Sequence, residues 1–166
     1  MDSAYQPEAW HDFYIMVGGA SAALTGLIFV AVSIHLRPVL RNHWHRGRAG
    51  SSLLALMSVV LISGAVLIPG QPLEALGTEV IAIALLSPVY TLLGAIHLPR
   101  EQRVAAVLEL LVGAISATLA VLGGLSLMTR WGGGLWLLLP GAAIALGSSV
   151  WNAWRLLVDV AAEHQS

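Results

Sequence analysis

The sequence predicts an all-α integral membrane protein: a bundle of five transmembrane helices with the N-terminus outside the cell and the C-terminus in the cytoplasm. Of its 166 residues, 57% are hydrophobic and only 10% are charged, whereas a soluble domain carries about 25% charged residues. The apolar residues gather in five long runs, and nearly all the arginines fall on one side of these runs. We expect a single membrane domain over 1–166.

Each run is long enough to cross a bilayer as a helix, which takes about 20 residues, and a helix satisfies its own peptide groups in lipid. The first run follows an acidic N-terminal segment, and the second ends at Pro69. Pro88, midway along the third, predicts a kink there. A glycine-rich turn joins the fourth and fifth, which should therefore be antiparallel neighbours. The expected helices are 13–34, 53–69, 79–98, 104–128 and 135–158.

The arginines set the predicted orientation, because short cytoplasmic loops collect basic residues. Seven of the eight basic residues fall on the side of the C-terminus, and only Arg130 falls on the other side. The six tryptophans lie near the expected membrane boundaries, as amphipathic rings do. Four arginines of the loop after the first helix are expected to face anionic lipid headgroups; they are Arg37, Arg41, Arg46 and Arg48.

Small residues form a strip on the first helix, where Gly18, Ala22 and Gly26 recur every four residues. In lipid, helices associate through close backbone contact, which such strips allow. The strip is therefore expected to be a docking surface, for another helix of the same chain or for a second copy. Gly113 on the fourth helix and Gly147 on the fifth are expected to be packing positions of the same kind.

Glu109 is the most informative charge in the sequence, because it lies inside the fourth helix, where a carboxylate needs a partner or water. On the fifth helix, Asn152 should lie at a similar depth, with Arg155 one turn further on. We expect Glu109 to hydrogen-bond Asn152, to pair with Arg155, or both. The result would be an interhelical lock or a proton- or ion-handling site. Ser148 and Ser149 extend this polar stripe.

Several chemistries find no support in the sequence. The net charge of −1 gives no basic field for nucleic acid, and the absence of cysteine excludes thiolate chemistry. No catalytic arrangement or phosphate loop is evident, so we expect a protein that is not an enzyme and needs no cofactor or metal. Four histidines near the inner boundary match no strong metal or haem pattern; they are His35, His43, His45 and His97.

The segment WHDFYIMVGGASAALTGLIFVAVSIHL, residues 10–36, resembles the opening of a family of small uncharacterised polytopic membrane proteins of actinobacteria. The shared pattern is an aromatic and acidic lead, a block of small residues, and an apolar run that ends in a serine. The resemblance implies a membrane protein but no particular activity. The plan of five helices in about 160 residues is also similar to that of the translocator-protein family, in architecture alone.

The leading functional expectation is a non-enzymatic, multi-pass protein of a bacterial inner membrane that acts through helix–helix association. Its partners would be membrane lipids, further copies of itself or another membrane protein. The alternative is a small oligomeric channel or transporter with a polar path along the fourth and fifth helices. A membrane enzyme or haem protein comes third.

Overall fold

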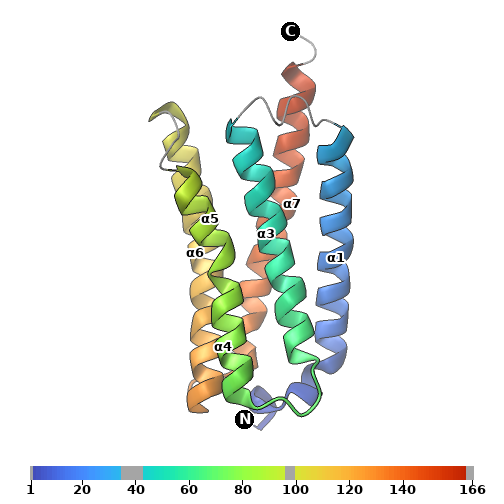
Figure 1. Ribbon diagram of the computed structural model, residues 1–166, viewed down its shortest axis with the longest axis vertical. Helices are drawn as coiled ribbons and strands as arrows, with labels where there is room; N and C mark the ends of the chain where they lie inside the picture. The colour runs from blue at the N-terminus through green and yellow to red at the C-terminus, as the bar shows by residue number, and fades with distance from the viewer. Residues whose placement is uncertain (1, 35–42, 96–99, 164–166) are drawn as a thin grey trace.

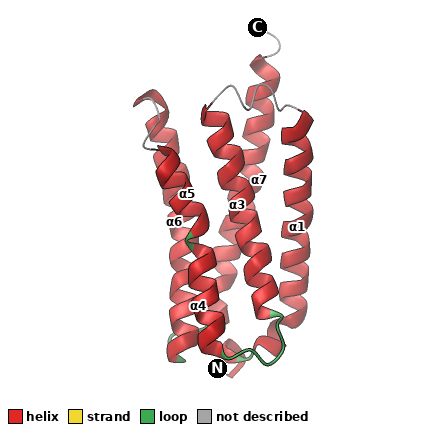
Figure 2. Ribbon diagram, in the orientation of Figure 1, coloured by secondary structure: helices red, strands yellow, loops and turns green. Residues whose placement is uncertain are grey.

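The computed structural model describes residues 2–34, 43–95 and 100–163, and within these ranges every regular element is a helix. Two short 3-10 helices, η1 (Asp2–Tyr5) and η2 (Pro7–Trp10), lead into α1 (His11–Ile34). The remaining helices are α3 (His43–Val66), α4 (Leu73–Ala84), α5 (Leu86–Ala95), α6 (Arg100–Thr129) and α7 (Leu135–Glu163) (Figures 1 and 2). Together they provide five helical spans long and apolar enough to cross a membrane.

Four helical columns surround the interior of the bundle: α3, the pair α4–α5, α6 and α7. Helix α3 packs against α7, α4 and α5, and α6 packs against α4, α5 and α7. Helix α1 lies outside this group and packs mainly along α3 (Figure 1). Most of the polar interior is therefore built by α3 to α7, with α1 covering one side.

The two ends of the bundle differ in how the chain turns. At the N-terminal end, which holds Trp10 and the start of α7, the link between α6 and α7 is a tight turn. Gly132, Gly133 and Gly134 all have positive φ there, a conformation that residues with a Cβ disfavour. The Tyr5 hydroxyl accepts a hydrogen bond from the Gly133 amide at 3.1 Å. The C-terminal end holds Ile34, His43 and Ala95.

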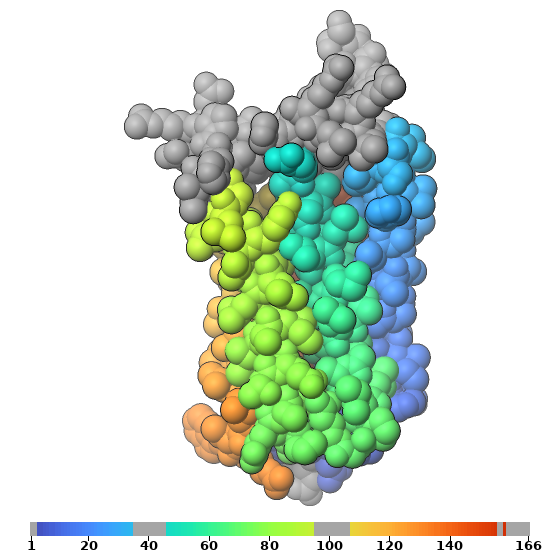
Figure 3. Space-filling model, in the orientation of Figure 1, coloured from blue at the N-terminus to red at the C-terminus, as the bar shows by residue number. Residues whose placement is uncertain are grey.

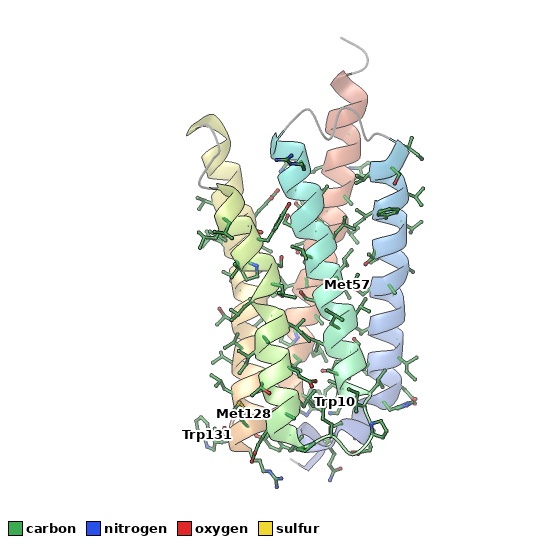
Figure 4. All side chains as sticks on the ribbon, in the orientation of Figure 1. Trp10, Met57, Met128 and Trp131 are labelled. Atoms are coloured by element: carbon green, nitrogen blue, oxygen red, sulfur yellow. The ribbon has the colours of Figure 1, made fainter. Side chains whose placement is uncertain are left out.

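The surface of the bundle is strongly apolar. Large side chains that are more than half exposed include Met16, Leu27, Leu108 and Trp154. Figure 3 shows one face of the bundle, to which α1, α3, α4 and α5 contribute. Trp131, 82% exposed, projects from the edge of the N-terminal end (Figure 4). Because these side chains need an apolar environment, this is the surface expected of a protein embedded in lipid.

An apolar core closes the N-terminal half of the interior. Trp10 and Tyr14 reach into it and meet buried side chains of α4, α6 and α7, among them Leu76, Leu127 and Leu135. The Trp10 ring also packs edge-on against Trp136, with 4.7 Å between ring centroids. This core separates the polar interior from the N-terminal end.

The five predicted spans are helical in the structure, but several of their boundaries differ from the predicted ones. Helix α3 begins ten residues before the predicted start at residue 53. Arg48, Ser51 and Ser52 lower the hydropathy of this segment, yet their side chains are buried in the bundle. The third expected helix begins at Leu73 rather than residue 79, and it divides at Leu85 into α4 and α5. Pro88 accounts for the division, since it cannot donate the backbone bond to residue 84.

The strip of small residues on α1 packs only in part. A Cβ at Gly18 would lie 2.9 Å from the Ser63 Cβ of α3, so this glycine does allow close contact. Ala22 and Gly26, in contrast, are exposed, and a Cβ at Gly26 would meet nothing within 4 Å. Of the two partners considered for this strip, a helix of the same chain meets it only at Gly18, because the buried face of α1 follows Tyr14, Val17, Ser21 and Ile28.

The closest backbone approach of the described helices joins α4 and α6. A Cβ at Gly77 would lie 2.5 Å from the Gly124 carbonyl oxygen, and one at Gly124 would lie 2.7 Å from the Gly77 carbonyl oxygen. Two helices can come this near only where neither carries a side chain. Sequence reasoning placed the packing glycines elsewhere, at Gly113 and Gly147, and a Cβ at either of these would meet nothing within 4 Å.

Candidate functional site

A buried ion pair joins α3 to α6 in the C-terminal half of the bundle. The Arg48 Nε lies 2.6 Å from the Glu109 Oε1, and the side chains are 2% and 16% exposed respectively. Arg48 also donates from Nη2 to the Asn152 Oδ1 of α7, at 3.4 Å. Two charges can stay inside an apolar bundle when they neutralise each other and find further hydrogen bonds. The guanidinium thus links three helices.

The partner of Glu109 differs from the one predicted. Glu109, Asn152 and Arg155 were expected to join directly across α6 and α7, but the ion-pair partner of Glu109 is Arg48, and Asn152 is linked through it. Arg155 is exposed and lines the same cavity as Glu109 without forming a salt bridge to it. The expectation that Arg48 faces lipid headgroups is wrong, because α3 begins early enough to carry it inside.

The signal for Arg48 was present in the sequence. Arg48, Ser52, Ala55 and Val59 follow a helical spacing of three to four residues, which places them on one face. The predicted span of residues 53–69 was also the shortest of the five, so an extension toward the N-terminus was the natural way to lengthen it. The extension was not predicted because Arg48 was assumed to lie in a loop outside the membrane.

A cavity of about 250 Å³ lies beside the ion pair. Glu109, Asn152 and Arg155 line it, together with Trp151, and the side chains of Trp151 and Arg155 are exposed. At about 30 Å³ for each molecule, it has room for about eight waters or one small organic solute. Its remaining polar lining consists of six hydroxyl side chains: Ser51, Ser52, Ser87, Thr91, Ser148 and Ser149.

Most of these hydroxyls donate to backbone carbonyls. The Ser51 Oγ donates to the Arg48 carbonyl at 3.0 Å, the Ser87 Oγ to the Ser51 carbonyl at 3.3 Å, and the Ser149 Oγ to the Ser52 carbonyl at 3.4 Å. Thr91 and Ser148 donate within their own helices. A hydroxyl that has used its proton offers only acceptor lone pairs. Together with the Glu109 carboxylate, these oxygens make the cavity rich in acceptors.

A second, smaller chamber of about 60 Å³ continues the cavity toward the middle of the bundle. Four residues line both spaces, so the two adjoin at this point, which we call the neck: Ala55, Ser87, Gly113 and Ser148. A Cβ at Gly113 would meet nothing within 4 Å. Gly113 therefore keeps the neck open, and the prediction that it packs two helices together is wrong.

The chamber ends at the apolar core. Tyr14 of α1 and Leu138 of α7 belong to both. Beyond them the core residues Leu127 and Leu135 are fully buried. The apolar core thus separates both spaces from the N-terminal end of the bundle.

The remaining predicted residues fall outside this site. Gly147 is exposed on α7, away from the cavity lining, and Arg46 is exposed on the first turn of α3. Arg37 and Arg41 lie outside the described residues, as do His35 and His97. Among the residues that the structure describes, no group of three or more metal-ligating side chains comes together.

Comparison of this chain with family models, with curated proteins and with solved structures finds no match. The resemblance of residues 10–36 to the actinobacterial family stays a prediction.

Proposed function

We propose that this chain is a small multi-pass channel or transporter whose path for a small polar solute runs through the interior of a single copy. The observation that carries the proposal is the pair of adjoining, hydroxyl-bearing spaces that reach from Arg155 to Tyr14 and that an apolar core closes toward the N-terminal end. Transporters commonly bind their solute near the middle of the membrane at a break in a helix. The break between α4 and α5 lies at this level, and Ser87 just after it lines both spaces.

The path proposed here differs from the one expected from sequence. It was expected along the fourth and fifth spans, α6 and α7, of several assembled copies. The described geometry adds α3 and α5 to the lining, with Ser52 and Ser87 facing Glu109 and Ser149 across one cavity. A single copy is sufficient to enclose such a path.

The proposed setting is a bacterial inner membrane, with the N-terminus outside and the cavity in the cytoplasmic half of the bundle. The arginine distribution supports this orientation through the positive-inside rule. Exposed Arg155 and Arg46 both stand toward the C-terminal end. The solute would then enter the cavity from the cytoplasmic side.

The test compares two valine variants in proteoliposomes. Gly113→Val places its side chain into the neck, and Gly147→Val adds the same atoms to an exposed face of α7, so it is the matched control. We expect the wild type and Gly147→Val to speed the flux of at least one small species among water, ammonia, protons, urea, glycerol and monovalent ions. Gly113→Val should slow that flux at least tenfold. If the wild type matches empty liposomes for the whole panel, the proposal is wrong.

Association through helix surfaces remains a second candidate, because the structure leaves Gly19, Ala22 and Gly26 exposed on α1. Small residues on a lipid-facing helix allow a close approach by another helix. The occupant we propose is a second copy, since no other described helix covers this strip. Mass measurement in gentle detergent decides it: a dimer in the wild type that becomes a monomer in Gly26→Leu supports this candidate, and a monomeric wild type contradicts it.

A further inference from the structure

The chamber at the middle of the bundle holds two hydroxyls that the rest of the fold does not explain. Tyr14 and Ser63 both line it, and their side chains are 1% and 2% exposed. Neither the Tyr14 Oη nor the Ser63 Oγ has a hydrogen-bond partner among the described residues. A buried hydroxyl without a partner is costly, and a polar space of sufficient size normally satisfies it with water.

The size of the chamber limits what it can hold. A volume of about 60 Å³ has room for about two water molecules at about 30 Å³ each. The neck lies between three small side chains and Gly113, where a Cβ would meet nothing within 4 Å. A solute with several non-hydrogen atoms does not fit without movement of a helix.

The other polar groups of the chamber favour a hydrogen-bond donor. The Ser58 Oγ donates to the Leu54 carbonyl at 2.8 Å, and the Ser116 Oγ donates to the Gly141 carbonyl at 2.8 Å. Both oxygens therefore retain acceptor lone pairs. Tyr14 and Ser63 can each accept or donate. A species with two or more protons to share, such as water, bridges these groups.

We propose that the chamber is a binding site for a water-sized hydrogen-bond donor, reached through the neck, and that it restricts the path to species of this size. This inference rests on the proposed function where it assumes a path for a solute. The binding site itself does not depend on the proposed function. Water, ammonia and a proton carried on water all meet the requirement, because each is water-sized and donates hydrogen bonds. Glycerol and urea do not, because each has at least four non-hydrogen atoms.

The site is tested by water-edited solid-state NMR of the protein in lipid bilayers, with tyrosine labelled at Cζ. The chain has three tyrosines, and loss of one signal in Tyr14→Phe assigns the chamber residue. We expect water magnetisation to reach the Tyr14 Cζ rapidly in the wild type and in Gly147→Val. It should arrive at least threefold more slowly in Gly113→Val, with Gly113→Ala between them. Equal build-up in all four proteins, whether fast or slow, overturns the inference.

The size limit is tested by the flux of water, ammonia and protons against that of urea and glycerol. Flux confined to the first group and reduced by Gly113→Val supports the inference and distinguishes its members. Glycerol flux that depends on Gly113 overturns the size limit but leaves the proposed function intact. If no species crosses while the Tyr14 signal still shows water, the proposed function falls and the binding site stands.

Discussion

The ion pair between Arg48 and Glu109 gives the sharpest stability prediction, because the two side chains are not equivalent. Glu109→Gln leaves a guanidinium that is 2% exposed and cannot lose its proton. An uncompensated buried charge of this kind costs about 3–5 kcal/mol. Arg48→Met leaves a carboxylate that lines a cavity with room for water, so its cost should be lower, about 1–3 kcal/mol.

The double variant Arg48→Met/Glu109→Gln removes both charges at once. Replacing a buried pair by uncharged side chains is often neutral or stabilising, so adding Arg48→Met to Glu109→Gln should restore stability. We expect a coupling of about 2 kcal/mol or more between the two sites. The matched control is Glu79→Gln, which alters an exposed glutamate of α4 and should change the free energy of unfolding by less than about 0.5 kcal/mol.

The measurement is reversible unfolding in mixed micelles, followed by circular dichroism as the fraction of denaturing detergent rises. The order of stability should be wild type, Arg48→Met and then Glu109→Gln, with the double variant above Glu109→Gln. If the double variant is less stable than the wild type by the sum of the two single effects, the two side chains act independently. The description of a neutralised buried pair would then be wrong.

Three further predictions concern helix packing, all read from unfolding in the same micelles. Ser21→Ala should lower the free energy of unfolding by about 1 kcal/mol, because the Ser21 Oγ donates to a carbonyl of α3 at 2.9 Å. The control Ser33→Ala removes a hydrogen bond within α1 at an exposed position and should lower it by less. Equal losses in the two variants would refute this prediction. Gly124→Ala should cost about 1–3 kcal/mol, since its Cβ would lie 2.7 Å from the Gly77 carbonyl oxygen, and a neutral result would contradict the close approach. Gly26→Leu should leave monomer stability unchanged, because nothing lies within 4 Å of its Cβ, so any large loss would show that this face is buried.

The helices could be predicted because a long apolar run crosses a bilayer as a helix. Every expected run overlaps a described helix, and Pro88 was predicted to interrupt the third, which divides at Leu85. The boundaries were less predictable where polar residues continue a helix into the interior. The start of α3 is the main example, since Arg48, Ser51 and Ser52 resemble a loop in composition but line or flank a cavity.

The site was predictable in part. Glu109, Ser148, Ser149 and Asn152 were identified from one-face spacing on two helices, and the structure brings them to one cavity. The contribution of α3 was missed, because a sequence shows which residues share a face but not which third helix packs against it. The free hydroxyl of Tyr14 gave no signal at all, since an aromatic residue near a membrane boundary is ordinary.

The central claim is that water reaches the interior of a single lipid-embedded bundle from its C-terminal end. The chain has no cysteine, so a single introduced thiol can be probed without background. Ser52→Cys replaces a side chain that is 3% exposed and lines the cavity, and Ala23→Cys places a thiol on the exposed face of α1 as the control. In sealed vesicles, a small charged methanethiosulfonate should modify Ser52→Cys only from the side that carries the C-terminus, and Ala23→Cys from neither side. Protection of Ser52→Cys from both sides, in folded protein, would contradict the account.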